Sequence, residues 1–335
     1  MATVNSTVSQ VRRITRVAVL IVLVAVVAVF IRGLASDQAD LDNLASFQAK
    51  SGLEVGPELA WFANGLHGDG AVFAIMTSDP LGRGEGALIF DPSYRYARVG
   101  YSWAASLASI GQESLILLGL SLVGLGSVVF VSIVSIGLRP TLGPKAWFLL
   151  LNPALVIGFL YDTAEPLGIA LLVMALRGGR FAPAIGLAVV RESYLVALAR
   201  RHLSFLLVLT VAIGVRLYWV FHFGDSLLGG AGNLALPFVG VTSKPSAAGV
   251  IVTATAFATV IIGIRCRNLA WILSGALVCS LGELVFANPI NSFRAAGMLP
   301  VLWAFGPTYR IPVSARIDTR ARVPFRRSGL GGAGS

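Results

Sequence analysis

Two acidic motifs in the first third of the chain contain residue types that could do chemistry. Asp69 lies between Gly68 and Gly70, and Asp79 follows further along, directly before Pro80. Flanking glycines let the backbone approach a ligand and leave the carboxylate exposed, which suits a general base or a metal-phosphate contact. An ordinary Asp-Gly turn is the competing interpretation. Asp69 is therefore the first candidate for a catalytic base, and Asp79 is the second.

A run of tyrosines and arginines, Tyr94-Arg95-Tyr96-Ala97-Arg98, follows these acidic motifs. The two arginines share one side of a helical turn, and the tyrosines beside them offer hydroxyl groups. The planar guanidinium fork matches the spacing of phosphate oxygens, so Arg95, Tyr96 and Arg98 are candidate substrate ligands for a phosphate or pyrophosphate. Interfacial anchoring by aromatic residues with flanking arginines is the alternative.

Two further constellations place charge inside apolar sequence. Asp162 stands three residues before Glu165, which precedes Pro166. Asp162 as N-cap, Glu165 at the third position and Pro166 in the first turn would start a helix, and both carboxylates are also candidate substrate ligands. Arg191 and Glu192 interrupt an apolar segment, and an ionisable pair inside a membrane is a functional candidate by default. Structural neutralisation of one by the other is equally consistent with the sequence.

The elements that must position these residues are membrane helices. Hydrophobic residues make up 56% of the chain and charged residues 13%, and apolar runs recur along nearly its whole length. This composition predicts an all-α, polytopic helical bundle with roughly eight to ten membrane-embedded helices. The predicted helices are 17–31, 98–112, 114–137, 146–161, 166–176, 181–199, 203–221, 247–264, 269–287 and 293–307. Because several are shorter than the ~20 residues that cross hydrocarbon, we interpret 166–199 as short or re-entrant helices packed inside the protein.

The distribution of charge predicts the topology. Nine of the 16 acidic residues fall between residues 37 and 91, whereas the net charge of the chain is +10, so the excess of positive charge lies elsewhere. Because short cytoplasmic loops carry excess Lys and Arg, residues 33–100, 222–246 and 288–294 are predicted on the outer side. The basic clusters assigned to the cytoplasm are Arg12, Arg13 and Arg16; Arg139 and Lys145; Arg177 and Arg180; Arg200 and Arg201; Arg265 and Arg267; and Arg310 through Arg327. Membrane-flanking basic residues explain the high net charge without nucleic-acid binding.

The apolar runs and the charge clusters divide the chain into three parts. Residues 1–16 form a cytoplasmic tail, residues 17–307 form the membrane domain with its large outer loop at 33–100, and residues 308–335 form a disordered cytoplasmic tail. The first apolar run also has the layout of a secretory signal peptide. Retention as an anchor is favoured because Arg32 follows the run directly. We therefore expect a multi-pass protein of the cell membrane with both termini in the cytoplasm.

Taken in order, these motifs resemble bacterial multi-spanning membrane proteins of the GT-C glycosyltransferase superfamily. The resemblance covers about residues 60–305 and includes Asn-Ser-Phe-Arg at 291–294 before Leu-Pro at 299–300. The opening Asp-Gly motif is similar to that of membrane mannosyltransferases related to those of glycolipid-anchor synthesis. The chain departs from the pattern at 71–73, where Ala-Val-Phe replaces the usual tyrosines, and at 96–98, where Tyr-Ala-Arg replaces Tyr-Gln-Arg.

The resemblance implies a helical-bundle enzyme that takes a sugar from a polyprenyl-phosphate donor at the outer membrane face. The acceptor would be a glycan, lipid or protein, in contact with membrane lipid. Asp69 matches the acidic position of the catalytic base in the first outer loop. No cofactor is implied, and a divalent metal is left open because no clear ligand cluster is present. The arginines that could stabilise the leaving lipid phosphate are Arg95, Arg98, Arg191 and Arg294.

Two other functions remain open on the sequence. A transporter or lipid flippase would use Arg191, Glu192, Arg216 and Glu283 to line a polar path through the bundle. A non-catalytic membrane scaffold would need none of these groups. The long acidic outer loop favours the enzyme, because a transport site is expected near the bilayer midplane.

Overall fold

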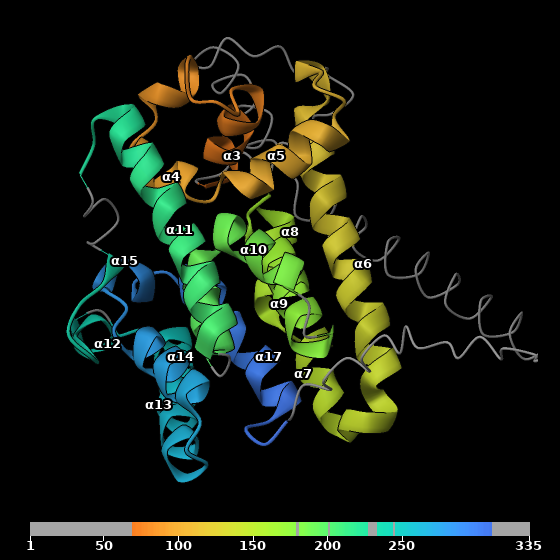
Figure 1. Cartoon of the computed structure of the whole chain (residues 1–335). Coiled ribbons are helices and arrows are strands. Elements are labelled where there is room, and N and C mark those ends of the chain that lie inside the picture. Colours follow the sequence, from red (N-terminus) through yellow and green to blue (C-terminus); the bar gives the residue numbers. More distant parts are fainter. Residues whose placement is uncertain (1–68, 179–180, 200–201, 227–232, 244, 310–335) are drawn as a thin grey trace, which may run out of the picture.

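The structure is a computed structural model that describes residues 69–309 except for 179–180, 200–201, 227–232 and 244 (Figure 1). Throughout these residues the regular elements are helices, apart from one antiparallel bridge between Leu234 and Leu281. The predicted all-α class is therefore confirmed for this part of the chain. The predicted tails, the apolar run at 17–31 and the outer loop before residue 69 lie outside the described residues.

The helices differ widely in length, and several short ones follow one another along the chain. The first half contains α3 (Asp69–Ser78), α4 (Pro92–Tyr96), α5 (Val99–Ala108), α6 (Ile116–Leu142), α7 (Trp147–Leu150), α8 (Pro153–Leu160), α9 (Glu165–Gly178) and α10 (Phe181–Val190). The second half contains the 3₁₀ helix η5 (Glu192–Leu198), then α11 (His202–Phe223), α12 (Val239–Ser243), α13 (Ala247–Arg265), α14 (Leu269–Cys279), α15 (Glu283–Phe286), α16 (Pro289–Ala295) and α17 (Met298–Phe305).

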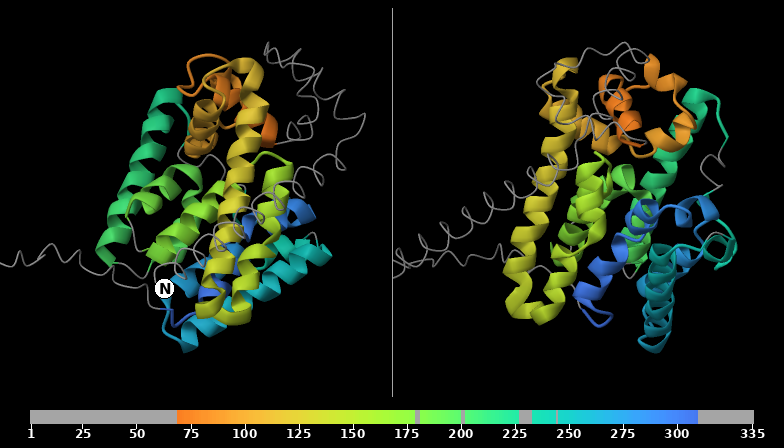
Figure 2. Two further views of the ribbon diagram at one scale, coloured as in Figure 1. Left: turned by 90° about the vertical axis from the view of Figure 1, so that its right-hand side faces the viewer. Right: turned by 180° about the vertical axis from the view of Figure 1, so that it is seen from behind.

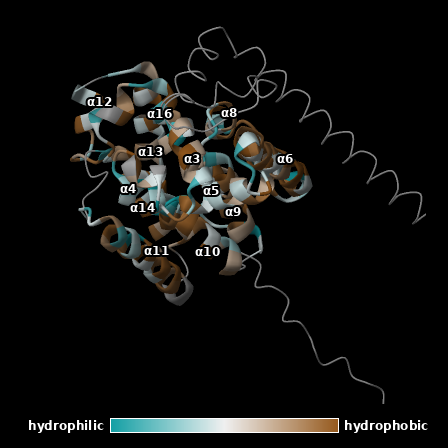
Figure 3. Cartoon of the chain, turned by 90° about the horizontal axis from the view of Figure 1, so that it is seen from above, coloured by the Kyte–Doolittle hydropathy of each residue, from teal (hydrophilic) through white to brown (hydrophobic). Residues whose placement is uncertain are grey.

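Three helical segments of the described chain are long and apolar enough to cross a membrane. They are Glu113–Leu150, which contains α6, Phe205–Phe223 in α11, and Ala247–Arg265, which is α13. At 1.5 Å per residue α6 extends roughly 40 Å, which exceeds the ~30 Å hydrocarbon core. Figure 3 shows apolar residues over the surfaces of α6 and α11. These helices identify a membrane protein, whereas the larger number of membrane-embedded helices and the GT-C-like arrangement stay predictions.

Several helices predicted as continuous are divided by capping residues. The predicted helix 146–161 consists of α7 and α8, because the Asn152 side chain accepts a hydrogen bond from the Ala154 amide and Pro153 opens the new helix. The predicted helix 269–287 ends as α14 at Cys279. Asn288 likewise caps α16, whose first residue is Pro289. An Asn-Pro pair starts a helix because Asn accepts a free amide and proline has none to leave unpaired.

The segment 166–199 forms short buried helices, as its sequence predicts. Its predicted helix 181–199 is broken between α10 and η5, where Arg191 has a non-helical backbone conformation (φ −155°, ψ 76°). Residues of α9, α10 and η5 contribute to the larger of two hydrophobic cores, together with α14 and α17. Short helices at membrane depth require this surrounding protein, because their terminal backbone groups cannot be left facing lipid.

The helices α3, α4 and α5 gather at one end of the bundle, beside the start of α6 and the end of α11 (Figures 1 and 2). A second hydrophobic core holds them there: Phe73 of α3 packs edge-on against Tyr101 of α5, and Tyr96 of α4 packs against Trp219 of α11. Arg139 lies in the last turn of α6, at the other end of that helix. Arg139 therefore lies far from α3, α4 and α5 along α6.

The predicted topology can be tested with the chain's own exposed cysteine. Cys266 follows α13 beside Arg267 and is exposed, and exposed Leu81 lies in the loop after α3. In a Cys279→Ala background, a membrane-impermeant maleimide should label Leu81→Cys in intact cells and leave Cys266 unlabelled until the membrane is opened. The basic residue beside Cys266 favours the cytoplasm. Labelling of Cys266 and protection of Leu81→Cys in intact cells would reverse the topology.

Candidate functional site

A cavity of about 550 Å³ lies where α3 and α4 meet the ends of α9, α10, α14 and α16. Four arginines and three carboxylates line it, which leaves an excess of one positive charge among these seven residues. The charged residues of the cavity wall are Asp69, Arg95, Arg98, Glu165, Arg191, Glu192 and Arg294. Buried charges are stable only when they are paired, so the geometry of these groups determines what the cavity can bind.

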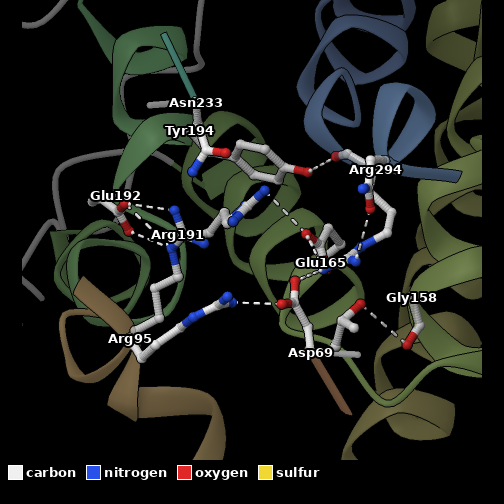
Figure 4. A network of polar contacts seen from close by, with 12 residues as sticks. Asp69, Arg95, Gly158, Glu165, Arg191, Glu192, Tyr194, Asn233 and Arg294 are labelled. Atoms are coloured by element: carbon white, nitrogen blue, oxygen red, sulfur yellow. Dashed lines mark hydrogen bonds and ion pairs between the residues drawn. The ribbon is translucent and has the colours of Figure 1, made fainter. Parts of the chain in front are cut away.

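Asp69, the first residue of α3, is held by two arginines from distant parts of the chain (Figure 4). Its Oδ1 atom lies 2.5 Å from Nη1 of Arg95, and its Oδ2 atom lies 2.7 Å from Nη2 of Arg294. Each carboxylate oxygen therefore accepts a charge-assisted hydrogen bond, the stronger class of hydrogen bond. This contact connects α3 to α4 and to α16.

Glu165 extends the same network into the protein interior. Its side chain is 1% exposed, and Oε1 lies 3.0 Å from Nη2 of Arg191 and 3.3 Å from Nη2 of Arg294. One carboxylate thus holds two arginines, and Arg294 is shared between Glu165 and Asp69 (Figure 4). The network is continuous from Asp69 through Arg294 and Glu165 to Arg191.

A separate ion pair forms on the other side of the cavity. Arg98 contacts Glu192 through Nη2 at 3.0 Å and through Nε at 3.2 Å, and Nη2 also donates to the Tyr94 hydroxyl at 2.7 Å. The guanidinium lies 4.4 Å from the Tyr94 ring centroid, a cation–π distance. The adjacent residues Arg191 and Glu192 therefore form their ion pairs with different residues, Glu165 and Arg98, rather than with each other.

Local backbone breaks bring these side chains to the cavity. Asp91 precedes Pro92 in the left-handed conformation (φ 51°) and starts α4, which carries Arg95. Asp162 is also left-handed (φ 46°), and the chain then turns into α9, whose first residue is Glu165. Asp tolerates this conformation better than most residues because its short side chain can bond locally.

Two glycines allow the close packing that the arginines need. A Cβ atom on Gly168 of α9 would lie 3.0 Å from Cβ of Arg191, and one on Gly297 would overlap the Tyr194 hydroxyl. That hydroxyl donates a hydrogen bond of 3.2 Å to the Arg294 carbonyl oxygen. Because these two positions have no Cβ atom, there is room for the Arg191 side chain and for the Tyr194 hydroxyl that holds the Arg294 backbone.

The arginines control the ionisation of the buried carboxylates. Burial by itself raises the pKa of Asp69, but the charges and hydrogen bonds of Arg294 and Arg95 outweigh it and hold that pKa well below its usual range. The same competition acts on Glu165, where burial opposes Arg294 and Arg191 and the pKa falls to about 2. Both carboxylates are therefore ionised at neutral pH.

One group of side chains in the cavity wall is aliphatic. It comes from α14, α15 and the segments that flank them and consists of Leu234, Leu277, Val278, Leu281, Val285 and Ile290. A cavity lined by both charged and aliphatic side chains suits an amphipathic ligand. The charged residues can contact the polar part of such a ligand, and the aliphatic residues can contact its apolar part.

The structure brings most of the predicted site residues into this cavity. Asp69 and the predicted ligands Arg95, Arg98, Glu165, Arg191, Glu192 and Arg294 all line it. Tyr96 and Asp162 do not. The Tyr96 hydroxyl donates to the Asp79 carbonyl oxygen, and buried Asp162 accepts a hydrogen bond from Ser121. Asp162 is also not the N-cap of α9, because the left-handed turn at Asp162 separates it from a helix that begins at Glu165.

Asp79, the second candidate for a catalytic base, lies outside the cavity wall. Its carboxylate accepts hydrogen bonds from the amides of Arg83, Gly84 and Gly86, at 3.0, 2.7 and 3.1 Å. A Cβ atom on Gly86 would overlap the Tyr96 hydroxyl. Asp79 therefore organises the loop after α3 in the manner of a turn-forming Asp.

Sequence reasoning did not select six polar residues of the cavity as site residues, and Tyr161 and Ser193 are two of them. Tyr94 lies in the tyrosine–arginine run, where spacing gave no reason to prefer it to Tyr96. Asn233, Asn288 and Asn291 also line the cavity. The Asn233 amide donates to the Tyr94 hydroxyl at 3.4 Å. Asn288 could have been found from the sequence, because an Asn-Pro pair predicts the start of a helix, and this helix carries Asn291 and Arg294.

Metal binding has no ready site in the part of the chain that is described. No group of three or more His, Cys, Asp or Glu residues there could hold a metal ion. The acidic residues of the cavity are instead each paired with arginine.

Comparison of the chain with models of protein families, with curated proteins and with solved structures finds no match. The site must therefore be interpreted from its own geometry.

The Glu165 network makes a prediction about acid stability. Because its folded pKa of about 2 is below the ordinary 4.5, Glu165 stabilises the fold above about pH 4.5 and loses that contribution as pH falls towards 2. Glu165→Gln should lower the melting temperature at pH 6, since breaking a buried pair costs about 3–5 kcal/mol. The variant should also lose less further stability between pH 6 and pH 3 than the wild type does.

Thermal unfolding of the purified protein in detergent at several pH values measures both effects. Glu113→Gln, at an exposed carboxylate outside the cavity, is the control and should follow the wild type. An equal pH dependence for Glu165→Gln and the wild type would show that Glu165 is not the group that titrates.

Proposed function

We propose that this protein is a membrane glycosyltransferase that moves a sugar from a polyprenyl-phosphate donor to a glycan, lipid or protein acceptor on the outer membrane face. The observation that carries the proposal is one cavity that is lined both by four arginines together with Asp69 and by a group of aliphatic side chains. The resemblance of the ordered motifs to the GT-C superfamily supports the same reaction.

The arginine wall supports a phosphate ligand. Four guanidiniums face three carboxylates, so the wall has one positive charge in excess and attracts an anion. The Nε atoms of Arg95, Arg191 and Arg294 are buried and have no hydrogen-bond partner in the described structure. A sugar phosphodiester carries one negative charge, which matches the excess. Its oxygens can accept from guanidinium groups in pairs.

The aliphatic wall supports a lipid as the rest of the donor. Leu281 and Val285 line the same cavity as Arg294, so a ligand that contacts both must join an anionic group to an apolar body. A polyprenyl phosphate has this composition. A nucleotide sugar does not, because its polar ribose and second phosphate would leave the aliphatic wall without an apolar partner.

The proposed reaction is a displacement at the anomeric carbon of the sugar. The acceptor hydroxyl oxygen forms the new glycosidic bond, its proton passes to the Asp69 carboxylate, and the bond from the anomeric carbon to the phosphate oxygen breaks. The polyprenyl phosphate leaves with an additional negative charge, which Arg95 and Arg294 stabilise from the cavity wall.

The transport alternative has less support from the arrangement of its residues. A polar path was expected to use Arg191, Glu192, Arg216 and Glu283, but only the first two line the cavity. Glu283 is exposed at the start of α15. The four residues expected to line one polar path are therefore not gathered in a single cavity of the described structure.

If Arg95 binds the donor phosphate, the shape of its guanidinium group should matter as well as its charge. Arg95→Lys keeps the charge but loses the fork that can contact phosphate and Asp69 together. We expect donor binding to weaken by about tenfold or more, which corresponds to the loss of one charge-assisted hydrogen bond. Arg83→Lys, at an exposed loop position, is the matched control. Unchanged donor affinity in Arg95→Lys would remove Arg95 from the phosphate site.

The role of Asp69 predicts a loss of turnover without a loss of donor binding. Asp69→Asn keeps the shape of the side chain and removes the proton acceptor, so sugar transfer should fall about 10²-fold or more. Asp79→Asn is the internal comparison. It weakens the amide contacts of a loop outside the cavity and should reduce transfer less.

Transfer assays in vesicles with labelled donor measure this prediction. Near-normal transfer by Asp69→Asn together with an inactive Asp79→Asn would assign the role to Asp79. Normal transfer by both variants would exclude a carboxylate base in this region.

A further inference from the structure

We propose that Asp69 is held in an ionic lock by Arg95 and Arg294, and that the phosphate of the donor opens the lock by taking over the two guanidiniums. The inference rests on the proposed function and adds regulation of the same site. In the structure both oxygens of the Asp69 carboxylate are occupied by these two arginines. In this state each oxygen already accepts a charge-assisted hydrogen bond, which leaves Asp69 a weaker acceptor for an incoming hydroxyl proton.

The lock can open because an anion competes for the same donors. Arg95 contacts Asp69 through Nη1, and within the described residues it forms no other ion pair. Its Nε atom has no hydrogen-bond partner in the same region. The phosphodiester of the donor offers two charged non-bridging oxygens, as the carboxylate does, and it matches the guanidinium fork equally well.

Arg294 is built to exchange one partner while it keeps another. Its Nη2 atom contacts Asp69 at 2.7 Å and Glu165 at 3.3 Å, and Glu165 is itself anchored by Arg191. The backbone of Arg294 is also fixed, because its carbonyl oxygen accepts from Tyr194. If Asp69 releases Arg294, Glu165 still neutralises the guanidinium. The arginine therefore stays at the cavity wall, in position to bind the phosphate.

Opening the lock would change Asp69 from a poor base into an effective one. Burial raises the pKa of this carboxyl and the two arginines lower it, so transfer of the arginines to phosphate leaves the effect of burial. A base with a higher pKa accepts a proton from a hydroxyl more readily. Deprotonation of the acceptor would then wait until the donor is bound.

The lock predicts an unusual effect of a charge-removing substitution on binding. Asp69→Asn no longer competes for Arg95 and Arg294, so the purified full chain should bind farnesyl phosphate about tenfold more tightly than the wild type does. Asp69→Ser should act in the same way and serves as a second variant, because Asn and Ser both suit the start of a helix. Calorimetric titration in detergent measures the affinity, with farnesol as the uncharged probe.

Glu192→Gln is the charge-matched control. It removes one negative charge from the same cavity, but its partner is Arg98 rather than Arg95 or Arg294. The lock predicts that Glu192→Gln tightens binding by clearly less than Asp69→Asn does. If both variants bind farnesyl phosphate more tightly by the same factor, the effect comes from the net charge of the cavity, and the lock is overturned.

The outcomes separate the lock from the function on which it rests. Binding of farnesyl phosphate but not farnesol, with tighter binding in Asp69→Asn, supports both. Binding that is unchanged or weaker in both Asp69 variants overturns the lock and leaves the phosphate site intact. Absence of farnesyl phosphate binding in the wild type and in every variant overturns the proposed donor and the lock together.

Discussion

The chain of ion pairs from Asp69 through Arg294 and Glu165 to Arg191 is the interaction on which the rest of the structure depends. Its members come from α3, α16, the start of α9 and the break after α10, which lie far apart in sequence. Removing one partner of a buried pair leaves an uncompensated charge and costs about 3–5 kcal/mol. The network therefore fixes how the short helices meet around the cavity.

The same network explains why the helices are short and interrupted here. Arg191 stands at the break between α10 and η5, where its backbone is non-helical, and from there its guanidinium reaches Glu165. The long helices α6, α11 and α13 provide the apolar frame, and the interrupted ones provide the polar interior. The charged side chains of the cavity are thus enclosed by the protein and joined in ion pairs.

The sequence predicts the helical class and most of the site, because charge in apolar sequence is conspicuous. Arg191 and Glu192 were identifiable for this reason, but their partners were not, since pairing with Glu165 and Arg98 depends on contacts between distant helices. Asp79 and Asp69 looked alike as Asp motifs. Only folding separates them, because Asp79 turns towards loop amides and Asp69 towards the cavity. Helix divisions such as that at Asn152 follow capping rules that periodicity alone overlooks.

The central claim is that Arg95 and Arg294 form the binding site for the phosphate of a lipid ligand. The most direct measurement is an experimentally determined structure of the full chain in a lipid nanodisc with a polyprenyl phosphate bound. The account predicts phosphate oxygens within ~3 Å of both guanidiniums and the isoprenoid chain along Leu281 and Val285. A lipid whose phosphate lies outside the cavity, with Asp69 still bound by both arginines, would contradict it.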